Sequence, residues 1–228
     1  AHGVAVRGLA RRPEAADWLA AQGADIRAGD LLDRDSLAAA LAGCATAVHA
    51  AAWTGSADWR AADAWRTNVD GTANVLAAAQ AAGVGRVLFI SSVAVYGVNR
   101  APIITEDQPT PHVGELYPDS KIAGEALVRA APIPHVIVRL ASTYGPRGAA
   151  WTIRPVEQIR RGELVLLGRD AGLVTPGYIE NVVDGLCLAL AYPAAAGQTF
   201  NLADDRAVTY RQFYLAYAAM LGRDRLPT

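Results

Sequence analysis

Short apolar runs alternate with longer amphipathic or alanine-rich runs along the whole chain. The short runs predict strands, and the longer runs, whose apolar residues recur at helical spacing, predict helices. Such alternation is typical of a doubly wound α/β fold, in which helices cover both faces of a parallel sheet. The predicted strands lie near Val4–Leu9, Asp25–Ala28, Thr46–Ala51, Arg86–Ser91, Pro134–Leu140, Leu164–Leu167 and Thr199–Leu202. The predicted helices lie near Pro13–Gln22, Asp35–Leu41, Trp59–Ala82, Glu115–Ala130, Ile153–Arg161, Glu180–Ala191 and Tyr210–Leu221.

Residues that commonly begin or end helices agree with these boundaries. Pro13 stands where a helix would open, and Gly43 and Gly222 each follow a predicted helix. Thr209 and Gln212 have the spacing of a capping box at the start of the last predicted helix.

A long loop is predicted over Val98–Gly114, which contains three prolines and two acidic residues. Loops of this length are uncommon in compact domains unless they have a function. We therefore expect a loop or lid on the substrate side.

The composition argues against several classes of partner. A chain of 228 residues with a formal net charge of −1 gives no reason to expect nucleic acid or an anionic membrane as partner. The two cysteines, Cys44 and Cys187, suit inert buried thiols better than a disulfide or a metal site. The longest weakly polar run, Leu37–Trp53, divides into a helix end and a strand and is not a membrane span. We expect a cytoplasmic protein with a small-molecule substrate. A homodimer is one alternative for its oligomeric state.

The most informative spacing is Tyr117-Pro-Asp-Ser-Lys121, because Lys121 is the one lysine among the 21 basic residues. A tyrosine has an ordinary pKa of about 10, so it exchanges a proton near neutral pH only where a nearby cation favours the phenolate. A lysine ammonium, with three donors on a compact group, can serve a phenolate and a ribose together. The spacing favours an acid/base tyrosine over the alternative, a surface helical pair without a partner.

Two further polar residues stand where the same chemistry would need them. Ser92 follows the predicted strand Arg86–Ser91, at the edge where open parallel sheets build their sites. Asn68 lies upstream, within an alanine-rich helical stretch. His49, at the end of another strand, is interpreted as a satisfied histidine and not as a second base, since the tyrosine already fills that role.

An Asn, Ser, Tyr, Lys set in this order resembles the catalytic tetrad of the short-chain dehydrogenase/reductase superfamily: Asn68, Ser92, Tyr117 and Lys121. Two longer sequence motifs resemble those of its extended, epimerase/dehydratase-like branch: Ser91–Gly97 and Arg139–Pro146. The resemblance covers nearly the whole chain, and its motifs together are specific. It implies a Rossmann-type fold and hydride transfer between a nicotinamide cofactor and a secondary alcohol or ketone.

The resemblance also implies a role for each member of the set. Tyr117 would move the hydroxyl proton while Ser92, in preference to Ser91, polarises the substrate oxygen. Asn68 would help to hold the water that connects Lys121 to bulk solvent. The alternative for Ser92 is a hydroxyl that only caps the loop after a strand, and for Asn68 a helix-interior amide bonded to nearby backbone.

Four residues are implied at the adenosine side of the cofactor. Asp30 and Leu31 match the family's Asp-Leu pair after the third strand, although Asp30 could instead cap the helix that follows. Ala50 and Ala51 are small where the backbone must approach the ribose, although both could be ordinary core alanines.

The second strand of such a fold discriminates between the two nicotinamide nucleotides. NAD enzymes place a carboxylate near its end, whereas an arginine there accommodates a 2′-phosphate. Here Gly8 stands in place of the acidic residue, and Arg11 and Arg12 follow, similar to the pattern of flavonol-type reductases. We therefore expect NADP, with NAD as the alternative in which both arginines are merely solvated.

The sequence contains no glycine-rich turn of the kind that binds a pyrophosphate. Its first residues resemble the second strand of the fold, so we expect a first βα unit of about 30 residues to be missing upstream. We expect residues 1–150 to form the dinucleotide-binding core and residues 151–228 to form a partial C-terminal substrate lobe interleaved with it.

The reaction is harder to choose than the family. Dehydratases carry an Asp-Glu pair after the catalytic hydroxyl, where this chain has Val93-Ala94. Galactose-type epimerases carry an Arg-Asp-Tyr-Ile motif, where this chain has Pro176–Ile179. They also carry an asparagine where this chain has Ser142. The word Tyr178–Asp184 resembles 3β-hydroxysteroid dehydrogenase-like and dihydroflavonol reductase-like members. We expect a reductase or alcohol dehydrogenase, with an epimerase as the alternative and a redox-silent NADP-binding regulator as a further one.

Overall fold

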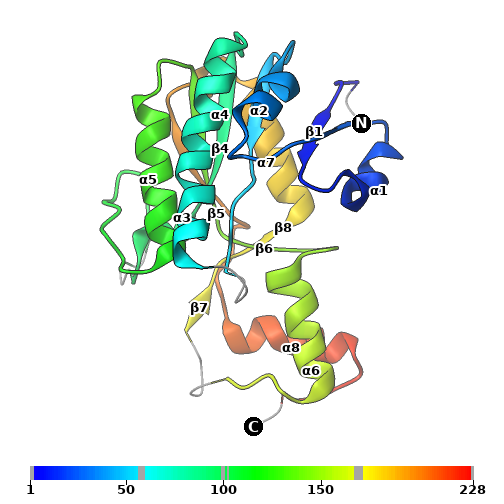
Figure 1. Ribbon diagram of the computed structural model, residues 1–228. Helices are drawn as coiled ribbons and strands as arrows, with labels where there is room; N and C mark the ends of the chain where they lie inside the picture. The colour runs from blue at the N-terminus through cyan, green and yellow to red at the C-terminus, as the bar shows by residue number, and fades with distance from the viewer. Residues whose placement is uncertain (1–2, 56–59, 99–100, 102, 167–171, 227–228) are drawn as a thin grey trace. The chain divides into compact units, whose positions relative to one another are not determined.

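The computed structural model describes residues 3–55, 60–98, 101, 103–166 and 172–226. The chain divides into two compact units, and each is described by itself. Unit 1 comprises Ala1–Val138 and Pro193–Thr199, and unit 2 comprises Arg139–Tyr192 and Phe200–Thr228. Figure 1 traces the elements in chain order from blue to red.

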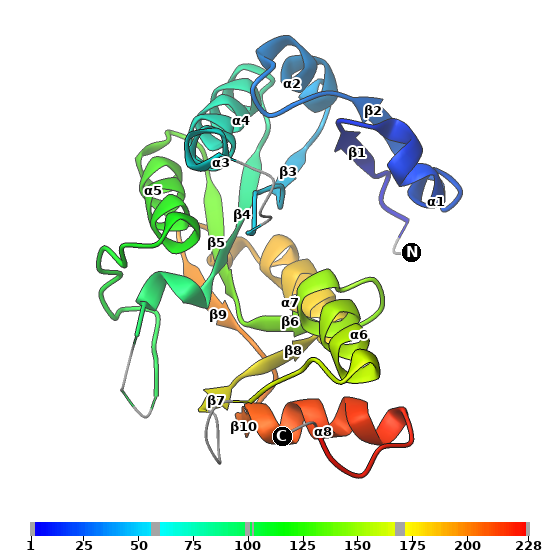
Figure 2. The same ribbon diagram turned by 60° about the horizontal axis from the view of Figure 1, so that its bottom comes forward.

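Unit 1 is built from parallel strands and the helices between them. β1 pairs in parallel with β2, and β3 pairs in parallel with β4, in a sheet of order β3-β4-β5-β9. Figure 2 shows α3, α4 and α5 along one side of β3 and β4. This is the predicted α/β fold. The bounds are β1 (Arg7–Ala10), η1 (Pro13–Ala16), α1 (Asp17–Ala20), β2 (Asp25–Ala28), α2 (Arg34–Leu41), β3 (Thr46–His49), α3 (Ala61–Asn68), α4 (Asp70–Ala81), β4 (Arg86–Ser92), η2 (Val93–Tyr96), α5 (Leu116–Ala130) and η4 (Pro193–Ala195). β5 (His135–Leu140) and β9 (Thr199–Leu202) begin in unit 1 and end in unit 2.

The core of unit 1 is centred on strand β4. Val87, Leu88 and Phe89 are buried in succession, as expected of a parallel strand that reads as a continuous apolar run. A Cβ at Gly124 of α5 would lie 2.7 Å from the Phe89 ring, so glycine allows this helix to pack closely on the strand. The surrounding apolar cluster consists of Ala47, Leu76, Ala79, Val84, Val87, Phe89, Val128, Ile133 and Ile137.

The helix predicted over Trp59–Ala82, whose first residue lies outside the described part of the chain, is divided in the structure. α3 ends at Asn68 and α4 begins at Asp70, with Val69 between them at φ −99° and ψ −58°. The hydroxyl of Thr72 donates 2.6 Å to the Asn68 carbonyl, and such bonds to the preceding turn bend helices. Asn68 is therefore the last residue of α3 and does not lie inside one continuous helix.

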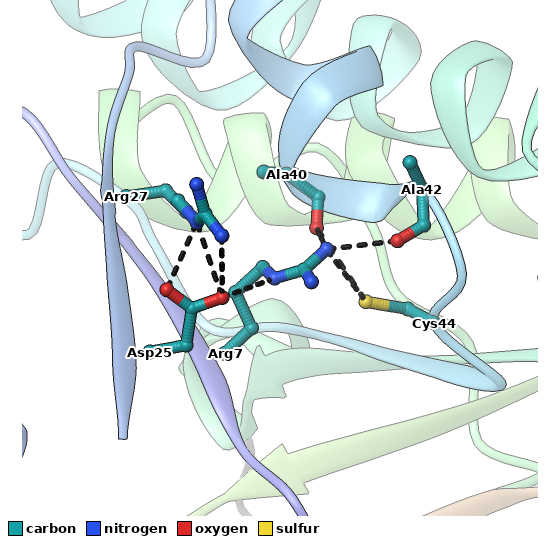
Figure 3. A network of polar contacts seen from close by, with 6 residues as sticks. All are labelled: Arg7, Asp25, Arg27, Ala40, Ala42 and Cys44. Carbon is teal, nitrogen blue, oxygen red and sulfur yellow. Dashed lines mark hydrogen bonds and ion pairs between the residues drawn. The ribbon is translucent and has the colours of Figure 1, made fainter. Parts of the chain in front are cut away.

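Arg7 connects β1 to β2 and to the end of α2 (Figure 3). Its Nε donates to Asp25 Oδ2 at 3.0 Å, and its Nη1 donates to the carbonyls of Ala40 and Ala42 at 2.9 and 2.8 Å. Those carbonyls lie at the C-terminal end of α2, where a cation stabilises the helix by interacting with its dipole. The neighbouring guanidiniums of Arg27 and Arg7 lower the pKa of Asp25. This network holds the β1–β2 pair against α2.

Unit 2 has two short ladders and an aromatic cluster. β6 pairs in parallel with β8, and β7 pairs antiparallel with β10. The bounds are β6 (Ser142–Tyr144), η3 (Ala149–Ile153), α6 (Arg154–Arg161), β7 (Leu173–Val174), β8 (Pro176–Tyr178), α7 (Ile179–Ala191), β10 (Val208–Thr209) and α8 (Tyr210–Met220). Ring contacts of 5.4 to 6.2 Å join Tyr144, Trp151, Tyr178, Tyr210, Phe213, Tyr214 and Tyr217. The capping box of Thr209 and Gln212 is confirmed at the start of α8.

Two predictions in unit 2 were wrong. No strand forms over the described residues of Leu164–Leu167, whose last residue lies outside the described part of the chain. Leu164 instead packs into an apolar cluster with Ile159 and Ala218, which satisfies its hydrophobicity without a ladder. Cys187 is exposed and not buried, and both it and Cys44 are free thiols.

The loop predicted over Val98–Gly114 is present in the residues that the structure describes, which exclude 99, 100 and 102. Its end is attached to α5, because Asp119 accepts hydrogen bonds from the backbone of Val113 and Gly114 at 2.7 and 3.0 Å. Across the described ranges, no helix combines the length and apolar character that crossing a membrane requires.

Candidate functional site

A cavity of ≈ 260 Å³ opens at the carboxyl ends of β1, β2 and β3. The ends of parallel strands are where open α/β sheets bind their ligands. Its lining residues all belong to unit 1: Leu9, Arg11, Gly29, Asp30, Leu31, Ala51, Ala52, Trp53 and Thr67.

The structure brings together four of the residues predicted to bind the cofactor, namely Arg11, Asp30, Leu31 and Ala51. Three predicted residues are not part of the lining: Arg12, Ala50 and Lys121. Arg12 is exposed at the start of η1, and Lys121 is buried on α5. Ala50 is exposed after β3, whereas Ala52, two positions further along, lines the cavity. Sequence reasoning also missed Trp53 and Thr67, for which no motif gave a signal.

Asp30 is held by a local turn and does not cap the helix. Its Oδ1 accepts a hydrogen bond from Leu32 N at 2.9 Å, and its own N–H donates to Ser36 Oγ at 3.1 Å. Asp33 caps α2 instead, accepting from the backbone of Asp35 and Ser36. The alternative interpretation of Asp30 as the cap is therefore wrong, and its carboxylate stands in the cavity wall.

Asn68 fastens the segment that carries Trp53. Its Oδ1 accepts from Trp53 N at 2.7 Å, while its Nδ2 donates to Trp53 O at 3.0 Å and to Ser120 Oγ at 2.8 Å. Both amide hydrogens are thereby used, so the side chain has none left to donate to a relay water. Asn68 is 3% exposed, and its bonds are those of a positioning residue for the cavity wall.

The indole Nε1 of Trp53 is buried and has no hydrogen-bond partner among the described residues. A buried donor without an acceptor costs free energy, on the order of 1–3 kcal/mol. Since Trp53 also lines the cavity, a ligand with an acceptor oxygen would fit this site.

Tyr117 lies at the start of α5, with Ser92 opposite at the end of β4. Ser92 lies close enough to Tyr117 for its hydroxyl to influence the phenol. Burial raises the pKa of Tyr117, and the Ser92 hydroxyl opposes that rise. Ser92 Oγ also accepts from Ala94 N at 3.2 Å, so it caps η2. At neutral pH the phenol is protonated and suited to donate a proton.

Lys121 lies one turn after Tyr117 and is 4% exposed. Its Nζ donates to the carbonyl of Ile90 at 2.9 Å and lies 5.0 Å from the centroid of the Phe89 ring. Burial lowers the pKa of Lys121 to about 8, against the opposing charge of Glu125. Most of the population is therefore an ammonium at pH 7, although burial makes that state costly.

His49 is buried and its Nε2 lies 2.9 Å from Thr72 Oγ1, so the prediction of a satisfied strand-end histidine is confirmed. Burial, aided by the charge of Lys121, lowers the pKa of His49 to about 3. The imidazole is neutral at physiological pH. Within the described ranges, no group of three or more His, Cys, Asp or Glu side chains could hold a metal ion.

Comparison with known proteins places these features in a family. The model of the NAD dependent epimerase/dehydratase family matches residues 1–203. A 4-hydroxy-2-methyl-3-oxo-4-farnesyl-3,4-dihydroquinoline-1-oxide ketoreductase from Stigmatella aurantiaca is 34% identical over 223 residues, which cover 93% of this chain and 65% of the relative. An N-acetyl-alpha-D-glucosaminyl-diphospho-ditrans,octacis-undecaprenol 4-epimerase from Escherichia coli O157:H7 is 32% identical over 183 residues, 77% of this chain and 54% of that protein. The chain thus spans less than two thirds of the length of either curated relative.

A solved structure supports the same assignment. A short-chain dehydrogenase/reductase superfamily protein from Agrobacterium tumefaciens, with bound NAD, superposes with a TM-score of 0.78 at 27% identity, covering 97% of this chain and 76% of that one. The Rossmann-type fold is shared, and with a family model that matches most of its length, this chain belongs to the NAD dependent epimerase/dehydratase family.

Proposed function

We propose that this protein is an oxidoreductase that transfers hydride between a nicotinamide dinucleotide and a ketone or secondary alcohol of a small molecule. The observation that carries the proposal is the position of Tyr117, one helical turn before the buried Lys121 and close enough to Ser92 for that hydroxyl to influence its pKa. A neutral phenol and a second hydroxyl can bind one substrate oxygen together, and the phenol can give it a proton. These are the groups that carbonyl reduction requires from a protein.

A nicotinamide dinucleotide fits the cavity lining of unit 1. Asp30, Leu31 and Ala51 would hold its adenosine side, and Trp53 would offer its unpaired N–H to an acceptor oxygen. When bound, the nicotinamide supplies or accepts the hydride. The protein's own groups then orient the substrate oxygen and move the proton at Tyr117 Oη.

The proposal favours NADP over NAD. Arg11 lines the cavity at the end of β1, where Gly8 stands in place of a carboxylate. An arginine fork suits a 2′-phosphate, and a carboxylate there would suit a free 2′-hydroxyl. Arg12 would add positive charge without lining the cavity.

The proposal extends to the rest of the chain. We assign cofactor binding to unit 1 and substrate binding to unit 2, whose aromatic cluster offers apolar surface with phenolic hydroxyls. A cytoplasmic location agrees with the free thiols of Cys44 and Cys187. The homodimer remains the assembly to be tested, by sedimentation.

An epimerase is the second candidate, because one of the relatives is named as a 4-epimerase. Both reactions need Tyr117, but an epimerase would leave the nicotinamide unchanged over a full cycle, whereas a reductase would consume NADPH. Incubation of the full protein with NADPH and a panel of ketones, beside a panel of nucleotide and polyprenyl-diphosphate sugars, separates them. Net NADPH oxidation supports the reductase, and sugar inversion without net oxidation supports the epimerase.

The test of the chemistry is Tyr117→Phe. We expect turnover to be abolished while cofactor affinity stays nearly unchanged, because the phenolic proton is used only in the chemical step. Normal turnover by this variant would falsify the proposed reaction and return a redox-silent binding protein to consideration.

A further inference from the structure

A second buried polar group lies directly behind the Tyr117–Lys121 pair. Glu125 is one turn beyond Lys121 on α5 and is 3% exposed. Its Oε1 accepts a 2.6 Å hydrogen bond from Ser91 Oγ, and its Oε2 accepts a 2.9 Å bond from Arg129 Nη2. Burying a carboxylate is costly unless it has such partners, so its presence calls for an explanation.

The position of Ser91 links this carboxylate to the end of β4. Ser91 is 2% exposed and directly precedes Ser92, whose hydroxyl influences the Tyr117 phenol. Neighbouring residues of a strand point to opposite faces, so the two hydroxyls serve different partners. The bond from Ser91 to Glu125 therefore fixes the orientation of the strand end that presents Ser92.

The charge of Glu125 acts on Lys121. From α5 itself, Lys121 is influenced by Glu125, and β4 contributes the Ile90 carbonyl and the Phe89 ring. From β3 it faces His49, which is neutral at physiological pH because burial lowers the pKa of that histidine to about 3. The Asn68 amide of α3 is bonded to Ser120, the residue that precedes Lys121 on α5. Within the described residues, Glu125 is thus the carboxylate that offsets the burial of the ammonium.

We infer that Glu125 is a positioning residue of the active site, which keeps Lys121 in its ammonium form and, through Ser91, holds the strand end that presents Ser92. Glu125 touches neither the phenol nor the cavity lining, so it acts through its neighbours. Arg129 is partly exposed and limits this effect, because its positive charge compensates part of the carboxylate's field. The inference rests on the proposed function, since a charged lysine matters only if Tyr117 exchanges a proton.

The single lysine of the chain allows a direct test. In protein labelled with ¹³Cε-lysine, the Lys121 resonance is assigned by its loss in Lys121→Met, and its chemical shift follows protonation of Lys121 without cofactor or substrate. In Glu125→Gln we expect Lys121 to titrate at least one pH unit lower than in the wild type, because a unit charge within about 10 Å shifts a pKa by one unit or more at an effective dielectric near 20. Glu115→Gln is the matched control, because it removes the same charge from the exposed start of the same helix.

Arg129→Gln supplies a second measurement that does not depend on burying an uncharged amide at position 125. Removing the compensating cation should make Lys121 titrate at a higher pH than in the wild type. A Lys121 titration that stays unmoved in a folded Glu125→Gln, or that fails to rise in Arg129→Gln, overturns the inference. That result leaves hydride transfer standing, whereas turnover by Tyr117→Phe would overturn hydride transfer and leave the lysine titration unaffected.

Discussion

The side chain of Asn68 reaches across 52 residues of sequence to donate a 2.8 Å hydrogen bond to Ser120 Oγ. Ser120 in turn donates to the backbone carbonyl of Tyr117 at 2.8 Å, and Asn68 also holds both backbone groups of Trp53. One amide therefore connects the wall of the unit 1 cavity to the turn that presents the candidate acid/base tyrosine. It does so as a structural brace, with both of its hydrogens already bonded.

Asn68→Ala should destabilise the protein by about 2–3 kcal/mol, because it leaves the part-buried backbone N–H and C=O of Trp53 without their side-chain partner and removes one hydrogen bond from Ser120. Urea unfolding of the two proteins measures the loss. Asn181→Ala is the control, since that exposed amide bonds to Asp204 at 2.8 Å and its removal should cost under about 1 kcal/mol. Equal losses for the two variants would contradict the bracing role.

Trp53→Phe should leave the stability of the unliganded protein nearly unchanged while weakening dinucleotide binding by about threefold to tenfold. The substitution removes an indole N–H that has no partner in the described residues, so the free protein loses no hydrogen bond. A bound ligand would lose one. Titration calorimetry together with thermal unfolding checks both halves, and undiminished affinity would exclude Trp53 Nε1 as a ligand donor.

Arg11→Ala should weaken NADP binding about tenfold or more and NAD binding much less, because a charge-assisted contact to a 2′-phosphate contributes about 1.5–3 kcal/mol. Arg12→Ala is the matched control, an exposed arginine one position further that does not line the cavity. Fluorescence titration with both nucleotides decides the matter. If Arg11→Ala weakens both equally, the preference for NADP has no support from this residue.

Lys121→Met should stabilise the protein and abolish its activity. The folded pKa of Lys121 is about 8, below its ordinary value of 10.5, so the unfolded chain binds this proton more tightly. Below pH 8 both states are protonated and the lysine costs the fold up to about 3 kcal/mol; the cost shrinks as pH rises from 8 to 10.5 and is absent above that range.

The stability difference between Lys121→Met and wild type should accordingly be largest at pH 7 and fall toward pH 10. Urea unfolding at several pH values, beside turnover of the full protein, tests this exchange of stability for function. A methionine variant that is less stable than wild type at pH 7 would show that burying the Lys121 ammonium does not destabilise the fold.

Much of this protein was determined by its sequence alone. The strand and helix order of unit 1 follows from the alternation of apolar runs, and the turn that separates Tyr117 from Lys121 follows from their spacing, since both are local properties of the chain. The positions of Arg11, Asp30 and Leu31 at strand ends follow in the same way, because parallel strands end at one edge of the sheet.

The tertiary structure decided what depends on distant neighbours. Strands β7 and β10 have only two residues each, too few to show a periodicity, and are defined by the partner they meet. The bonds of Asn68 to Trp53 and Ser120, and of Ser91 to Glu125, join residues 15 to 52 positions apart. The cost of burying a polar group selects its partner only after the chain has packed, which is why periodicity predicted the elements but not these contacts.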